Sequence, residues 1–164
     1  MDTNSNQHNN NNIGVLLVSH GSRLPYGREV INTLAQMYRE TVPYKVEVGF
    51  MEIARPNIPE AMNKLLEGEN FDKIVVMPVF LAGGVHINHD IPKILGLEDQ
   101  IEDYQRNNEH THDHEHGHHH HHDHDDGSDT TFEFDGEIIY TKPLGADPLV
   151  LQIIQNRINN ALKE

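Results

Sequence analysis

The chain has 164 residues, enough for one domain, a formal net charge of −14 and no cysteine. The missing cysteine excludes disulfides, zinc ribbons, iron–sulfur ligation and thiol catalysis, so a transition metal must be held by histidine and oxygen ligands. The chain contains neither an apolar run of eighteen residues nor a charged leader followed by an apolar segment. We therefore expect a soluble cytoplasmic protein that acts on neither membranes nor nucleic acids.

The negative charge is concentrated in one segment. Residues 98–137 hold 14 of the 26 acidic residues and one of the 12 basic residues, which leaves the remaining chain nearly neutral. Between residues 109 and 129, histidines alternate with aspartate and glutamate. This composition cannot bury enough apolar surface to fold, so we predict a disordered acidic histidine-rich insertion over residues 98–136. The Asn-rich residues 1–12 are expected to be a disordered tail, and residues 13–163 to form a single domain that the insertion interrupts.

The histidine-rich insertion has two open interpretations. Its imidazoles can collect divalent cations at many weak sites, which makes metal buffering the interpretation we favour. A low-complexity expansion without function is the other. A purification tag is excluded because the tract is internal and mixed with carboxylates.

The folded part begins with a strand, a helix and a second strand. Residues 13–19 form a continuous apolar run typical of a buried strand, and a helix is predicted over about residues 28–41. The second strand is predicted over residues 45–52. Four residues of the helix recur at helical spacing and are expected to cover the sheet: Val30, Leu34, Met37 and Tyr38.

The middle of the chain predicts a short helix followed by a third strand. Pro56 and Pro59 lead into the helix, which ends near Gly68, since proline suits a first helical turn and glycine a helix end. The third strand is predicted over residues 73–80. Pro78 cannot donate a hydrogen bond, so we expect the strand pairing to loosen there.

The last elements follow the third strand. Asp90 is expected to cap a short helix that Gly96 closes, and residues 137–141 are predicted to form a fourth strand. Asp147 and Pro148 open a final helix. Four of its apolar residues are expected to face inward: Leu149, Ile153, Ile154 and Ile158.

The order of the elements predicts the fold class. Strands that alternate with helices, and that are apolar throughout rather than at every second position, are typical of sheets covered on both faces. We therefore predict a three-layer, doubly wound α/β fold with a mainly parallel sheet of four strands. A folded body of about 110 residues is small for two clefts, which favours a symmetric dimer.

Two histidines follow predicted strands and are the first candidates for chemistry. His20 comes directly after the first strand, and His86 follows the Gly-Gly-Val segment after the third. Ligands of open parallel sheets bind beyond the carboxyl ends of the strands, so the two imidazoles are expected to face each other across one cleft. This arrangement indicates a metal site or a proton-transfer site.

The motifs around these histidines resemble a known family. Leu17-Val-Ser-His-Gly-Ser-Arg23, Gly49-Phe-Met-Glu52 and the segment from Pro78 to Pro92 are similar to the short class II chelatases. These are small archaeal sirohydrochlorin cobalt chelatases, also assigned as nickel chelatases in methanogens. The Pro143–Pro148 segment and the histidine-rich insertion resemble that group too. The resemblance covers residues 13–97 and 137–163.

The resemblance implies an enzyme that inserts Co²⁺ or Ni²⁺ into sirohydrochlorin, a tetrapyrrole with eight carboxylates, without ATP. Cobalt insertion leads to cobalamin, and nickel insertion leads to coenzyme F430. The metal is then a substrate, and no bound prosthetic group is expected. Family members of this length are homodimers, so we expect a homodimer here as well.

Metal insertion removes water from the cation and two protons from the pyrrole nitrogens, which requires neutral imidazoles as ligands and bases. We interpret His20 as base and metal ligand and His86 as the second ligand. A pair of ligands releases the metal more easily than a closed set of four. Glu52 is either a further metal ligand or proton relay, or an ordinary solvated carboxylate at the end of a strand, and both interpretations stay open.

Substrate contacts are predicted from the loop before His86. The loop lacks bulky side chains after its first residue, so a flat macrocycle can approach its backbone closely. The predicted substrate-binding residues of this loop are Leu81, Ala82, Gly83, Gly84, Val85 and His86. Arg55 is expected to pair with a substrate carboxylate, ahead of Arg23, Arg28 and Lys93. His89 is either a residue that supports the metal ligands from behind or a solvated loop residue, and we favour the second interpretation.

Two other functions compete with the chelatase. The Val18-Ser-His-Gly motif loosely resembles the Arg-His-Gly signature of histidine phosphatases, but Ser19 stands where that signature has its phosphate-binding arginine. The second is a nickel or cobalt storage or metallochaperone protein in which the histidine-rich tract is the function. Deletion of residues 109–129 distinguishes the two, because a chelatase keeps its turnover and a storage protein loses its activity.

Overall fold

The computed structural model describes residues 12–100 and 129–163. The predicted Asn-rich tail and most of the predicted insertion lie outside the described residues. At the borders of that insertion, Glu98–Gln100 forms a short 3₁₀ turn, η2, and Phe132 and Phe134 are partly buried against the core. These two phenylalanines therefore belong with the folded part of the chain.

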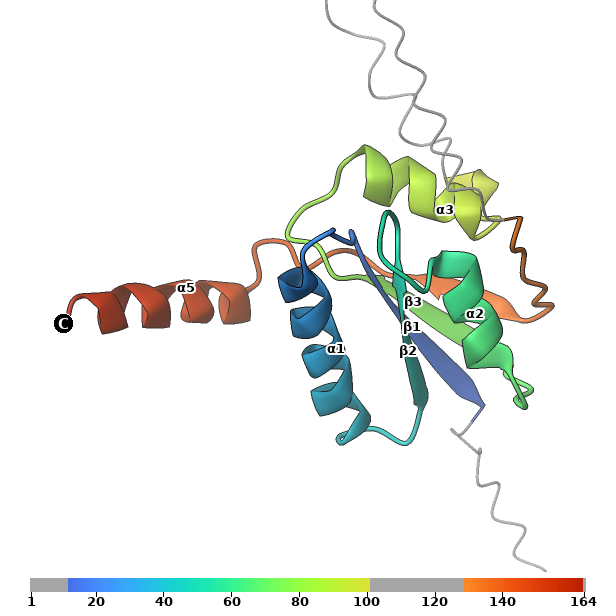
Figure 1. Ribbon diagram of the computed structural model, residues 1–164, viewed down its shortest axis with the longest axis horizontal. Helices are drawn as coiled ribbons and strands as arrows, with labels where there is room; N and C mark the ends of the chain where they lie inside the picture. Colours follow the sequence, from blue (N-terminus) through green and yellow to red (C-terminus); the bar gives the residue numbers. More distant parts are fainter. Residues whose placement is uncertain (1–11, 101–128, 164) are drawn as a thin grey trace, which may run out of the picture.

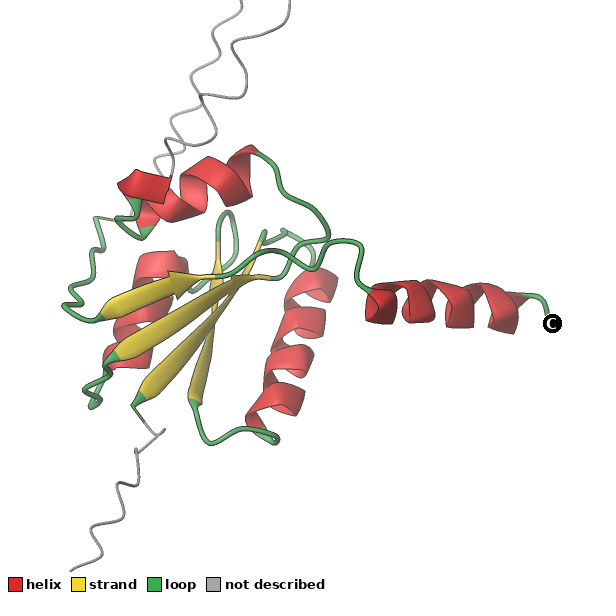
Figure 2. Ribbon diagram, turned by 180° about the vertical axis from the view of Figure 1, so that it is seen from behind, coloured by secondary structure: helices red, strands yellow, loops and turns green. Residues whose placement is uncertain are grey.

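One parallel sheet of four strands forms the centre of the molecule, in the order β2-β1-β3-β4 (Figure 2). The second, third and fourth strands end one or two residues earlier than expected, and β3 stops at Pro78, where a ladder hydrogen bond is lost. The predicted α/β fold is confirmed. The strands are β1 (Ile13–Ser19), β2 (Lys45–Phe50), β3 (Lys73–Pro78) and β4 (Glu137–Tyr140).

Helices lie on both faces of the sheet, as expected for a doubly wound fold (Figure 1). The first, α1 (Pro25–Arg39), packs on one face, whereas α2 (Ile58–Leu66) and the continuous η1 (His86–Asp90) and α3 (Ile91–Ile94) pack on the other. The element η1 is a single π-helical turn. The last helix, α5 (Pro148–Ala161), points away from the sheet (Figures 1 and 2).

The prediction of which α1 residues cover the sheet is wrong. Ile31 and Ala35 are the buried residues of α1, at 3% and 0% exposure. The small side chain of Ala35 lets the helix backbone approach the sheet closely, so the neighbouring apolar row is turned sideways and outward. The four residues expected inside are all at least 37% exposed: Val30, Leu34, Met37 and Tyr38.

The prediction that α5 faces inward is also wrong. Asp147 caps the helix by accepting a hydrogen bond from the Leu149 amide, as predicted, but no residue of α5 is buried. Ile153, Ile154 and Ile158 are each at least 50% exposed. The helix is apolar but short, and no helix within the described ranges has the length and apolar character needed to cross a membrane.

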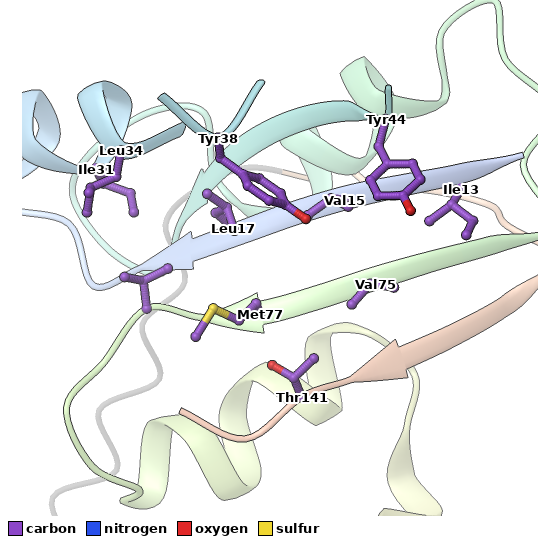
Figure 3. A pocket seen from close by; sticks show the side chains of 11 residues that line it. Ile13, Val15, Leu17, Ile31, Leu34, Tyr38, Tyr44, Val75, Met77 and Thr141 are labelled. Carbon is purple, nitrogen blue, oxygen red and sulfur yellow. The ribbon is translucent and has the colours of Figure 1, made fainter. Parts of the chain in front are cut away.

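An apolar groove of about 440 Å³ lies on the α1 face of the sheet (Figure 3). Side chains of β1 and β3 form its floor, and Leu34 and Tyr38 of α1 form part of its wall. The opposite face is covered by α2 and α3 over a larger buried core. The groove is lined by Ile13, Val15, Leu17, Ile31, Leu34, Tyr38, Tyr44, Val75, Met77, Val79 and Thr141.

Candidate metal site

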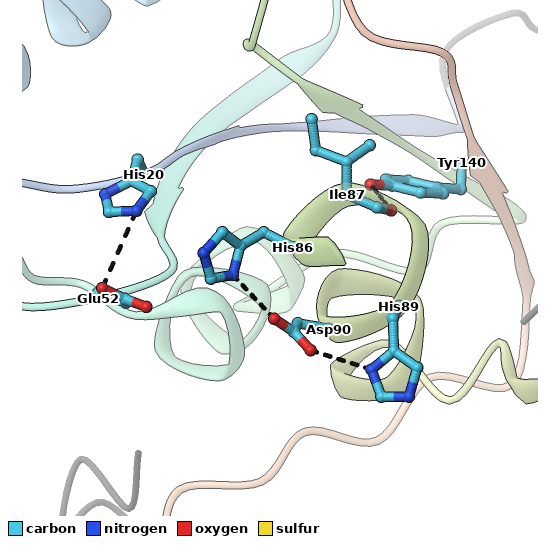
Figure 4. A network of polar contacts seen from close by, with 7 residues as sticks. All are labelled: His20, Glu52, His86, Ile87, His89, Asp90 and Tyr140. Carbon is cyan, nitrogen blue, oxygen red and sulfur yellow. Dashed lines mark hydrogen bonds and ion pairs between the residues drawn. The ribbon is translucent and has the colours of Figure 1, made fainter. Parts of the chain in front are cut away.

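Three adjacent strands place three potential metal ligands at one edge of the sheet. His20 follows β1, Glu52 lies two residues beyond β2, and His86 begins η1 after β3. Because β2, β1 and β3 are parallel neighbours, their carboxyl ends meet at this edge. One ligand atom from each of the three side chains lies within 4.8 Å of the others. The rings of His20 and His86 meet edge to face, with centroids 5.5 Å apart and an interplanar angle of 80° (Figure 4).

Main-chain hydrogen bonds beyond the strand ends fix His20 beside Glu52. The Met51 amide donates to the Ser19 carbonyl and the Glu52 amide to the His20 carbonyl, both at 3.0 Å. Gly21 has a φ of +94°, and a Cβ at this position would overlap the Glu52 carbonyl oxygen. The parallel pairing of β1 and β2 thus continues into the site, and only glycine fits where the two loops touch.

The Glu52 side chain faces the imidazole of His20. One of its carboxylate oxygens lies 3.9 Å from His20 Nε2, and the side chain is 24% exposed against 49% for His20. His20 Nδ1 lies 3.0 Å from the Gly21 carbonyl. A carbonyl can only accept, so Nδ1 donates and Nε2 keeps its lone pair for the site. Of the two interpretations of Glu52, the geometry favours the metal ligand or proton relay.

Asp90 has a role that the sequence reasoning missed. It was expected to cap a helix, but within the described residues its side chain makes no capping bond. Instead, one carboxylate oxygen lies 2.8 Å from His86 Nδ1 and the other 3.0 Å from His89 Nδ1 (Figure 4). The π-helical turn creates this arrangement. The His-x-x-His-Asp spacing, with a carboxylate four residues after the first histidine, was the available signal.

The two imidazoles affect the charge of Asp90. Partial burial raises the pKa of this carboxyl group, but the hydrogen bonds from His89 and His86 outweigh burial and lower it overall. Asp90 is therefore ionised at neutral pH. His89 is partly exposed, but its ring contacts this carboxylate, which favours the supporting role over the solvated one that the sequence favoured.

Tyr140 anchors η1 to β4 behind the site. Its hydroxyl donates to the Ile87 carbonyl at 2.7 Å (Figure 4). Burial raises the pKa of the Tyr140 phenol, because the charged phenolate is poorly solvated there. The bond fixes the turn that carries His86, so β4 supports the site although it contributes no ligand.

The loop between β3 and η1 is open to solvent beside His86. Residues 81–85 are all exposed, with Leu81 at 63% and Val85 at 61%. A Cβ at Gly84 would meet nothing within 4 Å, and one at Gly83 would touch only the Asn88 side chain. The loop thus presents an unobstructed and largely apolar surface next to the site.

Arg55 contacts a residue of its own chain. Its Nη1 lies 2.9 Å from a carboxylate oxygen of Glu60, and the other oxygen of Glu60 accepts from the Asn57 amide. Glu60 and Asn57 form the reciprocal capping box of α2. The structure places Arg55 in this network beside the start of the helix, and its pairing with a substrate carboxylate stays a prediction.

The chemistry of the site follows from its donor atoms. Two imidazole nitrogens and a carboxylate oxygen suit Co²⁺, Ni²⁺, Fe²⁺ or Zn²⁺. Three protein ligands leave coordination positions open, as in sites that exchange what they bind. All three residues are at least partly exposed, so a cation can enter and leave, and protons can exchange with water.

Solved structures share this architecture. A CbiX protein of cobalamin biosynthesis from Marinobacter aquaeolei superimposes with a TM-score of 0.58 at 20% identity, covering 92% of this chain and 95% of that one. The sirohydrochlorin chelatase SirB from Bacillus subtilis subspecies spizizenii, solved in complex with cobalt, gives a TM-score of 0.60 at 20% identity. That match covers 90% of this chain but 50% of SirB. These likenesses show the fold.

Sequence relatives cover the chain almost completely. A sirohydrochlorin cobaltochelatase of Methanothermobacter thermautotrophicus is 52% identical over 162 residues, which span 99% of this chain and all of that protein. A second, from Methanopyrus kandleri, is 48% identical over 93% of this chain and 99% of its own length. The sequence profile of the CbiX family matches residues 14–161. On the strength of this match and of the relatives' identity, the chain belongs to the CbiX family.

Proposed function

We propose that this protein is a chelatase that inserts a divalent metal ion, Co²⁺ or Ni²⁺, into sirohydrochlorin without ATP. The observation that carries the proposal is the set of His20, Glu52 and His86, open to solvent beside an exposed apolar loop. The names of the two methanogen relatives agree with it. Both the metal and the tetrapyrrole are substrates, and the product is the metallated ring.

The three side chains divide the work of metal transfer. His20 and His86 offer neutral imidazole nitrogens that replace water around the cation, and Glu52 adds a negatively charged oxygen. Insertion forms bonds from the metal to the ring nitrogens and releases two pyrrole protons. His20 accepts a proton as base once its nitrogen leaves the metal, and Glu52 is placed to take up the second. Both residues return their protons to water.

The loop of residues 81–85 is proposed to receive the macrocycle. A tetrapyrrole has apolar faces and a charged rim, so one face can lie on Leu81 and Val85 while the carboxylates stay in water. Ala82, Gly83 and Gly84 allow the ring to come close to the backbone above His86. Arg55 is proposed to contact a rim carboxylate in exchange for part of its contact with Glu60.

The decisive experiment is an anaerobic absorbance time course of sirohydrochlorin with Co²⁺, Ni²⁺ or Fe²⁺ in turn. Wild type, His20→Ala and an enzyme-free control are compared, with Gln36→Ala on the exposed side of α1 as matched control. We expect the protein to accelerate metal insertion, His20→Ala to lower the rate by about 100-fold or more, and Gln36→Ala to leave it unchanged. A wild-type rate equal to the enzyme-free rate with every metal would contradict the proposal.

The same assay separates the chelatase from a storage protein. A variant lacking residues 109–129 is expected to keep its turnover at saturating metal, because the three ligands lie on the folded part of the chain. Loss of all activity in this variant would favour storage or delivery by the histidine-rich tract. The ranking of the metals tests whether the product leads to cobalamin or to coenzyme F430, and a cytoplasmic location remains part of the proposal.

We further propose that the protein is a homodimer in which each α5 lies in the apolar groove of the other copy. The stripe formed by Leu151, Ile154 and Ile158 is apolar, and neither it nor the groove lining carries a charge. At about 21 Å, a helix of fourteen residues matches a six-residue strand of about 20 Å. The groove contributes 11 lining residues per copy, and the apolar stripe of α5 packs Leu151, Ile154 and Ile158 against them.

The dimer is tested by light scattering after size-exclusion chromatography. We expect twice the chain mass for wild type and for Asn156→Asp, whose side chain projects from the opposite side of α5. Ile154→Asp should give the monomer mass, because it places a charge in the apolar contact. A monomeric wild type would contradict the proposal.

Cross-linking then locates the helix, since the chain has no native cysteine. Leu34→Cys and Ile154→Cys proteins are mixed and treated with a short bis-maleimide. A cross-link between the two different chains supports the placement of each α5 in the groove of the other copy. A chain that carries both Leu34→Cys and Ile154→Cys is treated in the same way. A cross-link that forms only within this chain would show instead that α5 folds back onto its own groove.

A further inference from the structure

The carboxylate of Asp90 is shared by two imidazoles and takes no part in the mechanism proposed above. His86 Nδ1 approaches one oxygen at 2.8 Å, and His89 Nδ1 approaches the other at 3.0 Å. The three side chains come from one π-helical turn, in which the Ile91 amide donates to the His86 carbonyl. A regular α-helical turn would bond that carbonyl to the Asp90 amide instead and would rotate the side chains relative to one another.

The hydrogen bonds define the tautomer of His86. An ionised carboxylate has only acceptor atoms, so both Nδ1 atoms must carry the hydrogen. In neutral His86 the hydrogen on Nδ1 leaves Nε2 with its lone pair, and Nε2 faces His20 and Glu52 (Figure 4). Without Asp90, nothing in this contact would keep the hydrogen off Nε2, and an Nε2 that carries a hydrogen cannot bind the cation beside His20 and Glu52.

His89 holds the other side of the carboxylate. Asp90 has 36% of its side chain exposed, so water alone would leave it free to turn about its side-chain bonds. The bond from His89 occupies the second oxygen and keeps the first one aligned with His86. His89 itself contributes no atom to the set of three ligands.

We propose that Asp90 is a positioning residue for metal transfer, which holds His86 in its metal-binding tautomer and is itself held in place by His89. The metal reaches His86 Nε2 without a prior proton shift, and the ring keeps its orientation after the metal has left. The proposal rests on the proposed function for its consequence in catalysis. Its structural part, the control of the His86 tautomer by Asp90, can be tested without measuring turnover.

The structural part is tested by the ¹⁵N and ¹H spectrum of the histidine rings in the metal-free protein. Wild type and the control Asp99→Asn are expected to show His86 protonated on Nδ1. In Asp90→Ala the hydrogen should move to Nε2, the tautomer that free imidazole side chains favour. A wild-type His86 protonated on Nε2, or an unchanged tautomer in Asp90→Ala, would overturn the proposal whether or not the protein is a chelatase.

The catalytic consequence is tested by the KM for Co²⁺ and by kcat in the same variants. We expect the KM for Co²⁺ to rise about 10-fold or more in Asp90→Ala, with a smaller change in kcat, as for other residues that orient metal-binding histidines. Asp90→Asn keeps the shape and one acceptor and should lie between wild type and alanine. It also gives the answer if Asp90→Ala does not fold.

The role of His89 is tested by a conservative exchange. His89→Ala should raise the KM for Co²⁺ in the same direction as Asp90→Ala but by less, and His89→Gln should restore part of the loss because its amide group can donate to Asp90. Equal KM values in wild type, Asp90→Ala and His89→Ala would overturn the proposal. A loss in kcat alone, with an unchanged His86 tautomer, would do so as well.

Discussion

The two faces of the sheet are built to different degrees of completeness. The face under α2 and α3 is closed within the chain, and residues such as Leu65, Ile74 and Ile91 have no exposed surface. On the other face, α1 covers the sheet in part and leaves the groove of Figure 3. The first face therefore contributes most to the folding of one chain, while the second leaves apolar surface that the proposed dimer would cover.

Substitutions of leucine on the two faces should show the largest difference. Leu65→Ala removes a fully buried side chain of α2 and is expected to lower the free energy of unfolding by about 2–5 kcal/mol. Leu34→Ala in α1, where the side chain is 45% exposed, should cost less than about 1 kcal/mol in the monomer. Urea denaturation measures both, in the Ile154→Asp background, which is expected to be monomeric. Equal losses would remove the distinction between the faces.

The capping box at the start of α2, on the closed face, should make a smaller contribution to the free energy of unfolding. Asn57 accepts from the Glu60 amide, and the Glu60 side chain accepts from the Asn57 amide. Asn57→Ala should therefore lower the free energy of unfolding by about 1 kcal/mol. Thermal unfolding of the variant and of Asn156→Ala, on the exposed side of α5, checks this. No shift of the midpoint relative to that control would show that the capping box contributes nothing.

Because of Tyr140, the free energy of unfolding should depend on pH in the alkaline range. Its pKa in the folded protein is raised above the unfolded value of about 10, so the folded state binds the proton more tightly. The stabilisation is complete below pH 10 and is lost as the pH rises above 10 toward the folded pKa. Tyr140→Phe should lose about 0.5–1 kcal/mol at neutral pH with the bond to Ile87, and should lack this decline. Urea midpoints measured from pH 8 to 11 would show a parallel decline in both proteins if the assignment were wrong.

A substitution at the start of α1 should change the free energy of unfolding least, and should raise it rather than lower it. Leu24 stands at its N-cap and makes no side-chain capping bond within the described residues, and it is 61% exposed. Leu24→Asn supplies an acceptor for the free amides of the first turn and should raise the free energy of unfolding by about 0.5 kcal/mol. A melting temperature equal to that of wild type would indicate that the first turn of α1 is already satisfied.

Sequence patterns located the strands and the histidine pair because these depend on local order along the chain. A continuous apolar run followed by a polar loop predicts a strand end, and parallel neighbours bring such ends together. His20 and His86 meet for this reason. Glu52 was identified as a candidate, but its position beside the imidazoles depends on hydrogen bonds between two loops, which the sequence does not display.

The wrong predictions concern surfaces whose partners are not given by local pattern. Helical spacing shows that α1 and α5 each have an apolar side, but not what that side contacts. In α1 the small Ala35 is buried in place of the larger Leu34 and Met37, and in α5 the chain buries no apolar residue. Asp90 was misassigned because a carboxylate before a helix normally caps it, whereas here two imidazoles compete successfully for both oxygens.

The assembly of the three ligands from three separate strand ends couples cation binding to folding. Glu52 and His86 are 34 positions apart in the sequence, and they approach His20 only when β2, β1 and β3 are paired. The unfolded chain has no equivalent arrangement, so a cation that binds this set selects the folded state. By thermodynamic linkage, a cation present at 100 times its dissociation constant adds about 2.7 kcal/mol to the free energy of unfolding. The supply of the substrate metal thereby sets the fraction of the protein that is folded at equilibrium.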